Sequence, residues 1–95
     1  MTLFAVEYAY DIARTQDTET LRPQHRAFLT GLHEAGVLVA YGPWLDAAAP
    51  GALLLVHATN HDEVLKTLDA DPFHRAHLIV RRTARAWQPV IGQLS

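Results

Sequence analysis

The sequence predicts an α+β fold with the element order β-α-β-β-α-β. Residues 3–10 alternate between two sets of side chains, as expected of a strand covered on both faces at least in part. Residues 25–32 place His25, Phe28, Leu29 and Leu32 at the i, i+3, i+4, i+7 spacing of one helix face. Short apolar runs bounded by Gly, Pro and Asn supply the other strands.

The first half of the chain contains a strand, a loop and a helix. Residues 11–20 are polar and aperiodic, so we expect a loop there. We predict a helix from Pro23 to Ala35, because proline suits the first helical position and Gly36 suits the C-cap. His25 then lies in the first turn of this helix.

The second half of the chain continues the alternation of strands and helices. We predict, in order, a strand over 37–41 ended by Gly42-Pro43, a loop over 44–51, a strand over 52–58, a helix after Asn60, a turn over 71–73 and a strand over 78–91. Asn60 and Glu63 are typical of an N-cap and its capping-box partner. Pro89 indicates that the end of the last strand lies on an edge or outside the ladder.

Right-handed crossovers in both halves produce an antiparallel sheet with both helices on one face, which is a ferredoxin-like fold. The other face of the sheet stays bare, although Leu53, Leu55, Ile79 or their alternates must point there. Two such faces would cover each other in a homodimer, so we predict a homodimer through the open sheet face.

Composition excludes several classes of protein. The 95 residues suffice for one domain, predicted to span residues 1–95. The net charge is −2 with scattered Lys and Arg, which argues against nucleic-acid binding. Cysteine is absent, so disulfides and thiolate chemistry are excluded. No apolar run approaches the ~20 residues of a membrane span. Because residues 1–10 have no basic segment and include Glu7, we expect no signal peptide and a cytoplasmic location.

The topology predicts that three distant stretches meet at one end of the sheet. They are Arg22 to His25 at the start of the first helix, Gly42 to Trp44 after the second strand, and Asp71 to Phe73 after the second helix. Asp71 would then be a partner for the His25 imidazole. A helix N-terminus disfavours a protonated histidine, whereas a carboxylate orients the ring and stabilises the imidazolium. Together they suit reversible proton transfer near neutral pH.

The same end offers residues for binding a flat ligand. Trp44, Phe73, and Tyr8 or Tyr10 would wall a pocket and stack on an aromatic ring. Arg22 would pair with a carboxylate or a phenolate. We therefore predict His25 and Asp71 as catalytic residues and Arg22, Pro43, Trp44 and Phe73 as substrate-binding residues.

Simpler interpretations stay open for each residue. Asp71 before a proline is a natural helix N-cap, and His25 could be a core histidine with satisfied hydrogen bonds. His74 could reach the pocket or lie on the surface. His57 and His61 make a poor zinc signature without a carboxylate or cysteine nearby, so we expect no metal. We expect no other cofactor.

The motifs R-P-Q-H at 22–25, G-P at 42–43 and D-P-F at 71–73 resemble those of the YCII-related (YciI-like) domain family, and the resemblance covers nearly the whole chain. The resemblance implies a ferredoxin-like dimer of the α+β barrel type. It also implies that His25 and Asp71 match the pair to which the family's catalysis is attributed. That family has been linked to chloride elimination from hydroxylated chloroaromatics. The loop over 44–51, which would help to shape the pocket, is short here.

The sequence thus predicts a small cofactor-free enzyme that performs His/Asp acid–base chemistry on a small aromatic or enol-like metabolite. The reaction would be an elimination, an isomerisation or a lyase step, with dehydrochlorination as one form. Two alternatives stay open: a dimeric module that binds a small ligand without turnover, and cofactor-free oxygenase chemistry.

Overall fold

A four-stranded antiparallel sheet forms the frame of the molecule. The computed structural model describes residues 1–46 and 48–92. The strands are β1 (Thr2–Tyr10), β2 (Leu38–Pro43), β3 (Gly51–Ala58) and β4 (Ile79–Ala86). Their order in the sheet is β2-β3-β1-β4, with every neighbouring pair antiparallel. The predicted α+β class and βαββαβ order are therefore confirmed.

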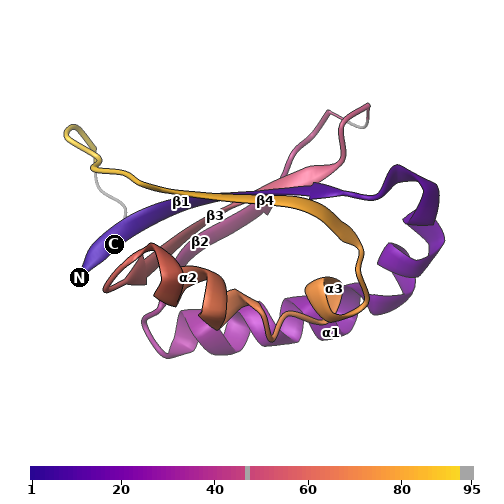
Figure 1. Cartoon of the computed structure of the whole chain (residues 1–95), viewed down its shortest axis with the longest axis horizontal. Helices are drawn as coiled ribbons and strands as arrows, with labels where there is room; N and C mark the ends of the chain where they lie inside the picture. Colours follow the sequence, from indigo (N-terminus) through magenta and orange to yellow (C-terminus); the bar gives the residue numbers. More distant parts are fainter. Residues whose placement is uncertain (47, 93–95) are drawn as a thin grey trace.

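The helices cover one face of this sheet and leave the other face open (Figure 1). They are a short 3-10 turn, η1 (Ile12–Arg14), followed by α1 (Thr15–Glu34), α2 (His61–Leu68) and α3 (Pro72–Arg75). As predicted, the Asn60 side chain caps α2 by accepting from the Glu63 N–H at 2.9 Å, and Glu63 reaches back to the Thr59 N–H at 2.8 Å. This layered arrangement is the ferredoxin-like fold expected from the sequence.

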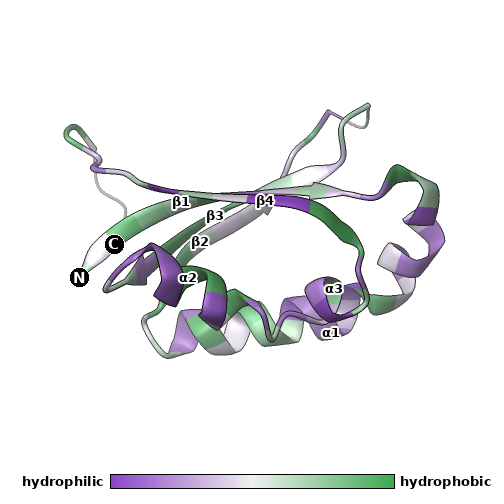
Figure 2. Cartoon of the chain, in the orientation of Figure 1, coloured by the Kyte–Doolittle hydropathy of each residue, from purple (hydrophilic) through white to green (hydrophobic). Residues whose placement is uncertain are grey.

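The core lies between the helices and alternate side chains of the central strands. Figure 2 shows apolar residues along β3 and much of β1, whereas polar and apolar residues alternate along α1 and α2. The core-facing residues of β1 are all buried: Phe4, Val6, Tyr8 and Tyr10. Val6 is opposite Leu54 in the register, and Leu54 is fully buried against the helices. Leu53 and Leu55 alternate with Leu54 and therefore point to the open face.

The prediction of a loop over residues 11–20 is wrong, because these residues form η1 and the first turns of α1. Pro23 lies inside α1 and does not begin it. This stretch has few apolar residues, so its helical period is weak. Its helix is instead supported by side-chain pairs three residues apart: Arg14–Asp17 at 3.0 Å and Glu19–Arg22 at 2.7 Å.

The last strand is shorter than predicted, since β4 ends at Ala86 and not at Ile91. The Trp87 N–H still donates to the Leu3 carbonyl at 2.9 Å, but Pro89 has no N–H to continue the ladder. Val90 and Ile91 are exposed. Ile79 also departs from the expectation, because it packs against the core.

Within residues 1–46 and 48–92, none of the helices is both long enough and apolar enough to cross a membrane.

Candidate active site

His25 and Asp71 form a buried pair between α1 and α3. The His25 Nδ1 atom lies 2.8 Å from Asp71 Oδ1 and 3.0 Å from Oδ2. Both side chains are completely buried. They are 46 positions apart in the sequence, so only the packing of the two helices brings them together.

Asp71 occupies this position because it is the N-cap of α3. Its Oδ1 accepts from the Phe73 N–H at 2.9 Å, and Pro72 takes the first helical position. Its Oδ2 accepts from the Tyr8 hydroxyl at 3.4 Å. The cap interpretation and the partner interpretation are therefore both correct, since one carboxylate serves α3, His25 and Tyr8.

The hydrogen bonds select one tautomer of His25. An ionised carboxylate only accepts, so Nδ1 carries the proton that faces Asp71. Nε2 is then the accepting nitrogen, and the Tyr41 hydroxyl donates to it at 3.0 Å. Asp71, His25 and Tyr41 thus form one hydrogen-bonded chain that runs from α3 through α1 to β2.

Aromatic rings fix the imidazole in place. The Phe73 ring stacks on it with centroids 3.8 Å apart and planes only 3° from parallel. The Tyr41 ring meets it edge-on at 5.3 Å. Phe73, predicted to bind substrate, is itself fully buried behind His25. Its ring contacts the imidazole and the ring of Tyr10.

The position of His25 within α1 overturns one electrostatic expectation. His25 follows Thr15, the first residue of α1, by ten positions, which places it about 15 Å from the helix N-terminus. The helix dipole acts within about one turn of the end, so it does not bear on this ring. The environment of His25 is set by Asp71, Tyr41 and Phe73.

A cavity of about 250 Å³ lies between the start of α1 and the loop joining β2 to β3. Arg22, Pro43 and Trp44 line it, so three of the four predicted substrate-binding residues lie on one cavity. Arg22 is held there by the ion pair with Glu19, which lines the same cavity. The cavity volume is slightly below the ~300–1,000 Å³ of sites for drug-sized ligands, so the cavity suits a ligand with a single ring.

Backbone contacts fix the loop beside this cavity. The Trp44 N–H donates to the Gly51 carbonyl at 3.0 Å, and the Tyr10 N–H donates to the Pro50 carbonyl at 3.0 Å. A Cβ at Gly51 would collide with the Tyr8 carbonyl and touch the Trp44 ring. Glycine is therefore required at this position for the loop to approach β1 so closely.

The sequence analysis did not identify Tyr41 as a site residue. Tyr41 is opposite Leu54 in the register, on the helix-facing side of β2. It is half-buried and lines a second cavity of about 430 Å³ between α1 and β2. It therefore joins the buried pair to the surface. The available signal was its place immediately before Gly42-Pro43, at the end of the strand that approaches His25.

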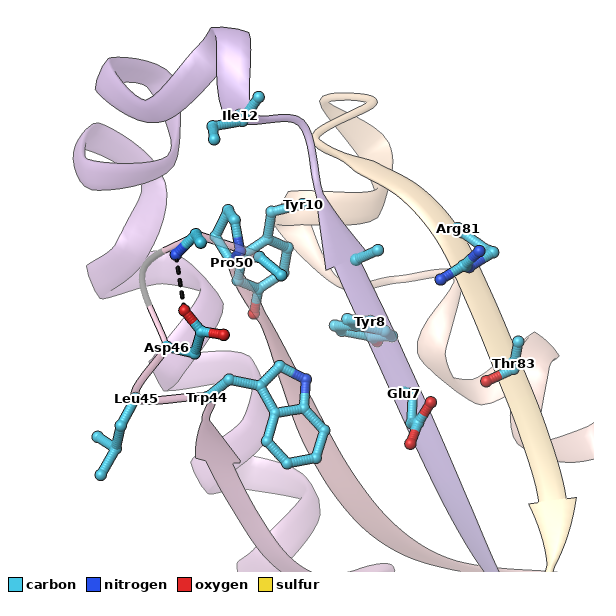
Figure 3. Close-up of a pocket in the computed structure, with 13 residues that line it drawn as sticks. Glu7, Tyr8, Tyr10, Ile12, Trp44, Leu45, Asp46, Pro50, Arg81 and Thr83 are labelled. Atoms are coloured by element: carbon cyan, nitrogen blue, oxygen red, sulfur yellow. Dashed lines mark hydrogen bonds between the residues drawn. The ribbon is translucent and has the colours of Figure 1, made fainter.

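A further cavity of about 610 Å³ lies on the open side of the sheet. Figure 3 shows Glu7 on β1 and Thr83 and Arg81 on β4, with Trp44 projecting from the loop after β2. Despite its size, this cavity lies across the sheet from the His25–Asp71 pair. It shares Tyr10 and Trp44 with the 250 Å³ cavity.

The remaining histidines are elsewhere. His74 lies 3.4 Å from Asp69, and His61 lies 3.6 Å from Asp62 at the start of α2. His57 is on β3 opposite Leu3. Among the residues that the structure describes, no three His, Asp or Glu side chains gather as a metal site would require.

Comparison with known proteins identifies the fold and the family. The fold matches a crystal structure of 5-chloro-2-hydroxyhydroquinone dehydrochlorinase (TftG) from Burkholderia phenoliruptrix AC1100 in complex with 2,5-dihydroxybenzoquinone. The TM-score is 0.79 at 25% identity, over 90% of this chain and 93% of that one. This match confirms the dimeric α+β barrel fold class. No curated protein sequence matches the chain. The YCII-related domain model matches residues 2–88, so the chain belongs to the YCII-related domain family.

Proposed function

We propose that the protein is a cofactor-free lyase that eliminates hydrogen chloride from a small hydroxylated chloroaromatic compound. The observation that carries the proposal is the continuous chain from Asp71 through His25 to Tyr41, which links a buried carboxylate to a half-buried hydroxyl. The structural similarity to a dehydrochlorinase supports this class of reaction.

In this proposal Tyr41 relays the proton that His25 receives. A substrate hydroxyl gives its proton to Tyr41 Oη while the Tyr41 proton passes to His25 Nε2. The imidazolium that forms lies 2.8 Å from Asp71 Oδ1, whose negative charge stabilises it. Because His25 is completely buried, this relay lets it act without touching the substrate.

The elimination balances without an oxidant. The relay first moves a proton from a hydroxyl to the ring carbon that carries chlorine, which gives a keto tautomer. It then removes a second hydroxyl proton, and the pair from that O–H bond forms a carbonyl. The displaced π electrons break the C–Cl bond, and chloride leaves with the bonding pair. The net loss is one proton and one chloride, and the product is a quinone.

The 250 Å³ cavity is the proposed binding site for the ring. Pro43 lines both this cavity and the 430 Å³ cavity that Tyr41 lines, so a hydroxyl of the bound ring would meet Tyr41 Oη at Pro43. Arg22 would pair with a phenolate oxygen, Trp44 would stack on the ring, and Pro43 would shape the wall. Phe73 is proposed to contribute as a positioning residue, since its ring lies against His25.

The test is chloride release and quinone formation with 5-chloro-2-hydroxyhydroquinone. We expect turnover by the wild type and a loss of about 10²–10⁴-fold in His25→Gln, the range that general acid–base catalysis supplies. His61→Gln is the matched control, because His61 lies at the exposed start of α2. Turnover that survives in a folded His25→Gln protein would exclude the mechanism.

The complete burial of His25 favours one alternative, a module that binds the same ligand without turnover. Calorimetric titration with 2,5-dihydroxybenzoquinone separates the two functions. A binding module would bind the quinone, release no chloride from the chlorinated compound, and keep its affinity in His25→Gln.

We also propose that the protein forms a homodimer through the open sheet face. Leu53 is half-buried on this face and Leu55 only 7% exposed, whereas the adjoining Trp44 is 44% exposed. A domain of this size has a modest core, so covering an apolar sheet face would stabilise it. The 610 Å³ cavity beside Glu7 and Arg81 opens on this side and would be closed by the partner.

A further inference from the structure

Three tyrosine hydroxyls, those of Tyr8, Tyr10 and Tyr41, lie around the buried pair, and in the described structure that of Tyr10 is unpaired. Tyr8 donates to Asp71, and Tyr41 donates to His25. Tyr10 is 9% exposed and its Oη atom is buried, yet in residues 1–46 and 48–92 no acceptor meets it in hydrogen-bonding geometry, although the Tyr41 hydroxyl is its neighbour. Buried hydroxyls are nearly always paired, so an unpaired one needs an explanation.

Packing holds this hydroxyl in place. The Tyr10 ring meets the Phe73 ring edge-on, with centroids 5.4 Å apart and an angle of 86° between planes. The Tyr10 backbone is tied to Pro50, and Figure 3 shows the two residues together at the end of β1. With its ring against Phe73 and its backbone fixed, Tyr10 cannot turn its hydroxyl to solvent at low cost.

The hydroxyl is also a permanent donor. Burial, followed by the neighbouring Tyr41 hydroxyl, raises the pKa of Tyr10 well above its usual range, so the group keeps its proton. The proton of Tyr41 is already directed to His25 Nε2. Tyr10 thus adds a second hydroxyl next to the outer end of the proposed relay.

Tyr10 lines the 250 Å³ cavity together with Arg22 and Trp44. We propose that the Tyr10 hydroxyl donates a hydrogen bond to a ring oxygen of the bound hydroxylated aromatic, and that it selects ligands carrying an oxygen at that position. This inference rests on the proposed function, because it assumes that the cavity binds the ring. A ligand without the oxygen would leave a buried donor unpaired, which is the strongest form of discrimination available to such a site.

Affinity for 2,5-dihydroxybenzoquinone tests the proposal. Trp44 lines the cavity and Trp87 lies beyond the end of β4, so a Trp87→Phe background leaves Trp44 as the reporter of binding by fluorescence quenching. In this background, we expect Tyr10→Phe to weaken binding about 10-fold, as for loss of one buried hydrogen bond.

Thermal unfolding of the free protein supplies a second readout. Tyr10→Phe should unfold at the wild-type temperature or above it, because the hydroxyl that it removes has no partner in the described structure. Tyr8→Phe is the matched variant. It should unfold at a lower temperature, because the Tyr8 hydroxyl donates to Asp71.

Each outcome decides the proposal. Equal quinone affinity in wild type and Tyr10→Phe would overturn the role of Tyr10 and leave the proposed function standing. A wild type that neither binds the quinone nor releases chloride would overturn both. A Tyr10→Phe protein destabilised as much as Tyr8→Phe would show that the hydroxyl bonds within the protein, which also overturns the inference.

Discussion

Replacing Asp71 by Asn removes one negative charge and almost no volume from the centre of the proposed site. The Asn side chain can keep its carbonyl oxygen at Oδ1, which caps the Phe73 N–H. Its amide group would then face His25 Nδ1 and the Tyr8 hydroxyl, in the place of an oxygen that now accepts. The helix cap is retained while the electrostatic partner of His25 is lost.

The size of the effect follows from the geometry. His25 Nδ1 and Asp71 Oδ1 are 2.8 Å apart. With the charges spread over both groups, their centres are about 4 Å apart, which is worth about 4 kcal/mol at an effective dielectric constant of ~20. This energy stabilises the imidazolium only after the proton has arrived. Since about 1.4 kcal/mol is a factor of ten, we expect turnover to fall about 10³-fold.

Folding stability should also fall. The bonds that His25 and Phe73 make to a charged acceptor become bonds to a neutral one. Hydrogen bonds to charged groups contribute about 1.5–3 kcal/mol, and neutral ones about 0.5–1.5 kcal/mol, so these two bonds together lose about 2–3 kcal/mol. The Tyr8 hydroxyl also loses its acceptor, which brings the expected loss in the free energy of unfolding to about 3–4 kcal/mol.

Three measurements assess this prediction together. They are the rate of chloride release, the urea-unfolding free energy, and the ¹⁵N shifts of the His25 ring, which should show Nδ1 protonated in the wild type. Asp62→Asn is the control, because it removes the same charge from a fully exposed position at the start of α2. An Asp71→Asn protein that is folded and loses less than about tenfold in rate would refute the electrostatic role of Asp71.

Three further predictions concern the relay, the dimer and the buried tyrosines. Tyr41→Phe should slow chloride release by about 10²-fold or more, because His25 Nε2 loses the group that relays its proton; chloride release from a folded variant at the wild-type rate would remove Tyr41 from the path. Leu53→Glu should give a monomer in sedimentation velocity, since it places a carboxylate opposite Glu7 on the open face; a wild type that sediments as a monomer would contradict the dimer. Burial raises the pKa values of Tyr8 and Tyr10, so both stay protonated in the folded state, whereas in the unfolded chain they ionise near pH ~10. These tyrosines should therefore leave the free energy of unfolding unchanged below about pH 10 and lower it above that pH, by up to about 1.4 kcal/mol per pH unit for each. Urea unfolding at a series of alkaline pH values should show that the free energy of unfolding falls less steeply with pH in Tyr8→Phe than in the wild type.

Features that depend on near neighbours in the chain could be predicted from the amino-acid sequence. The period of β1, the cap at Asn60 and the cap at Asp71 are each written within a few residues, so periodicity and capping rules identify them. Handedness rules then place His25 and Asp71 at one end of the sheet. The same local logic failed for residues 11–20, where a solvated helix carries no apolar stripe and Pro23 resembled a helix start.

Which atoms meet in the site depends on how the whole domain packs. Tyr41 reaches His25 Nε2 because the register of β2 on β3 turns that side chain toward α1, and a shift of one residue would point it to the open face. The burial of His25 and the unpaired hydroxyl of Tyr10 depend equally on how α1, α3 and the loop after β2 pack. Hydrogen bonds require positions accurate to a fraction of an ångström, and pairs 16 to 63 positions apart acquire that accuracy only from the packing of the whole domain.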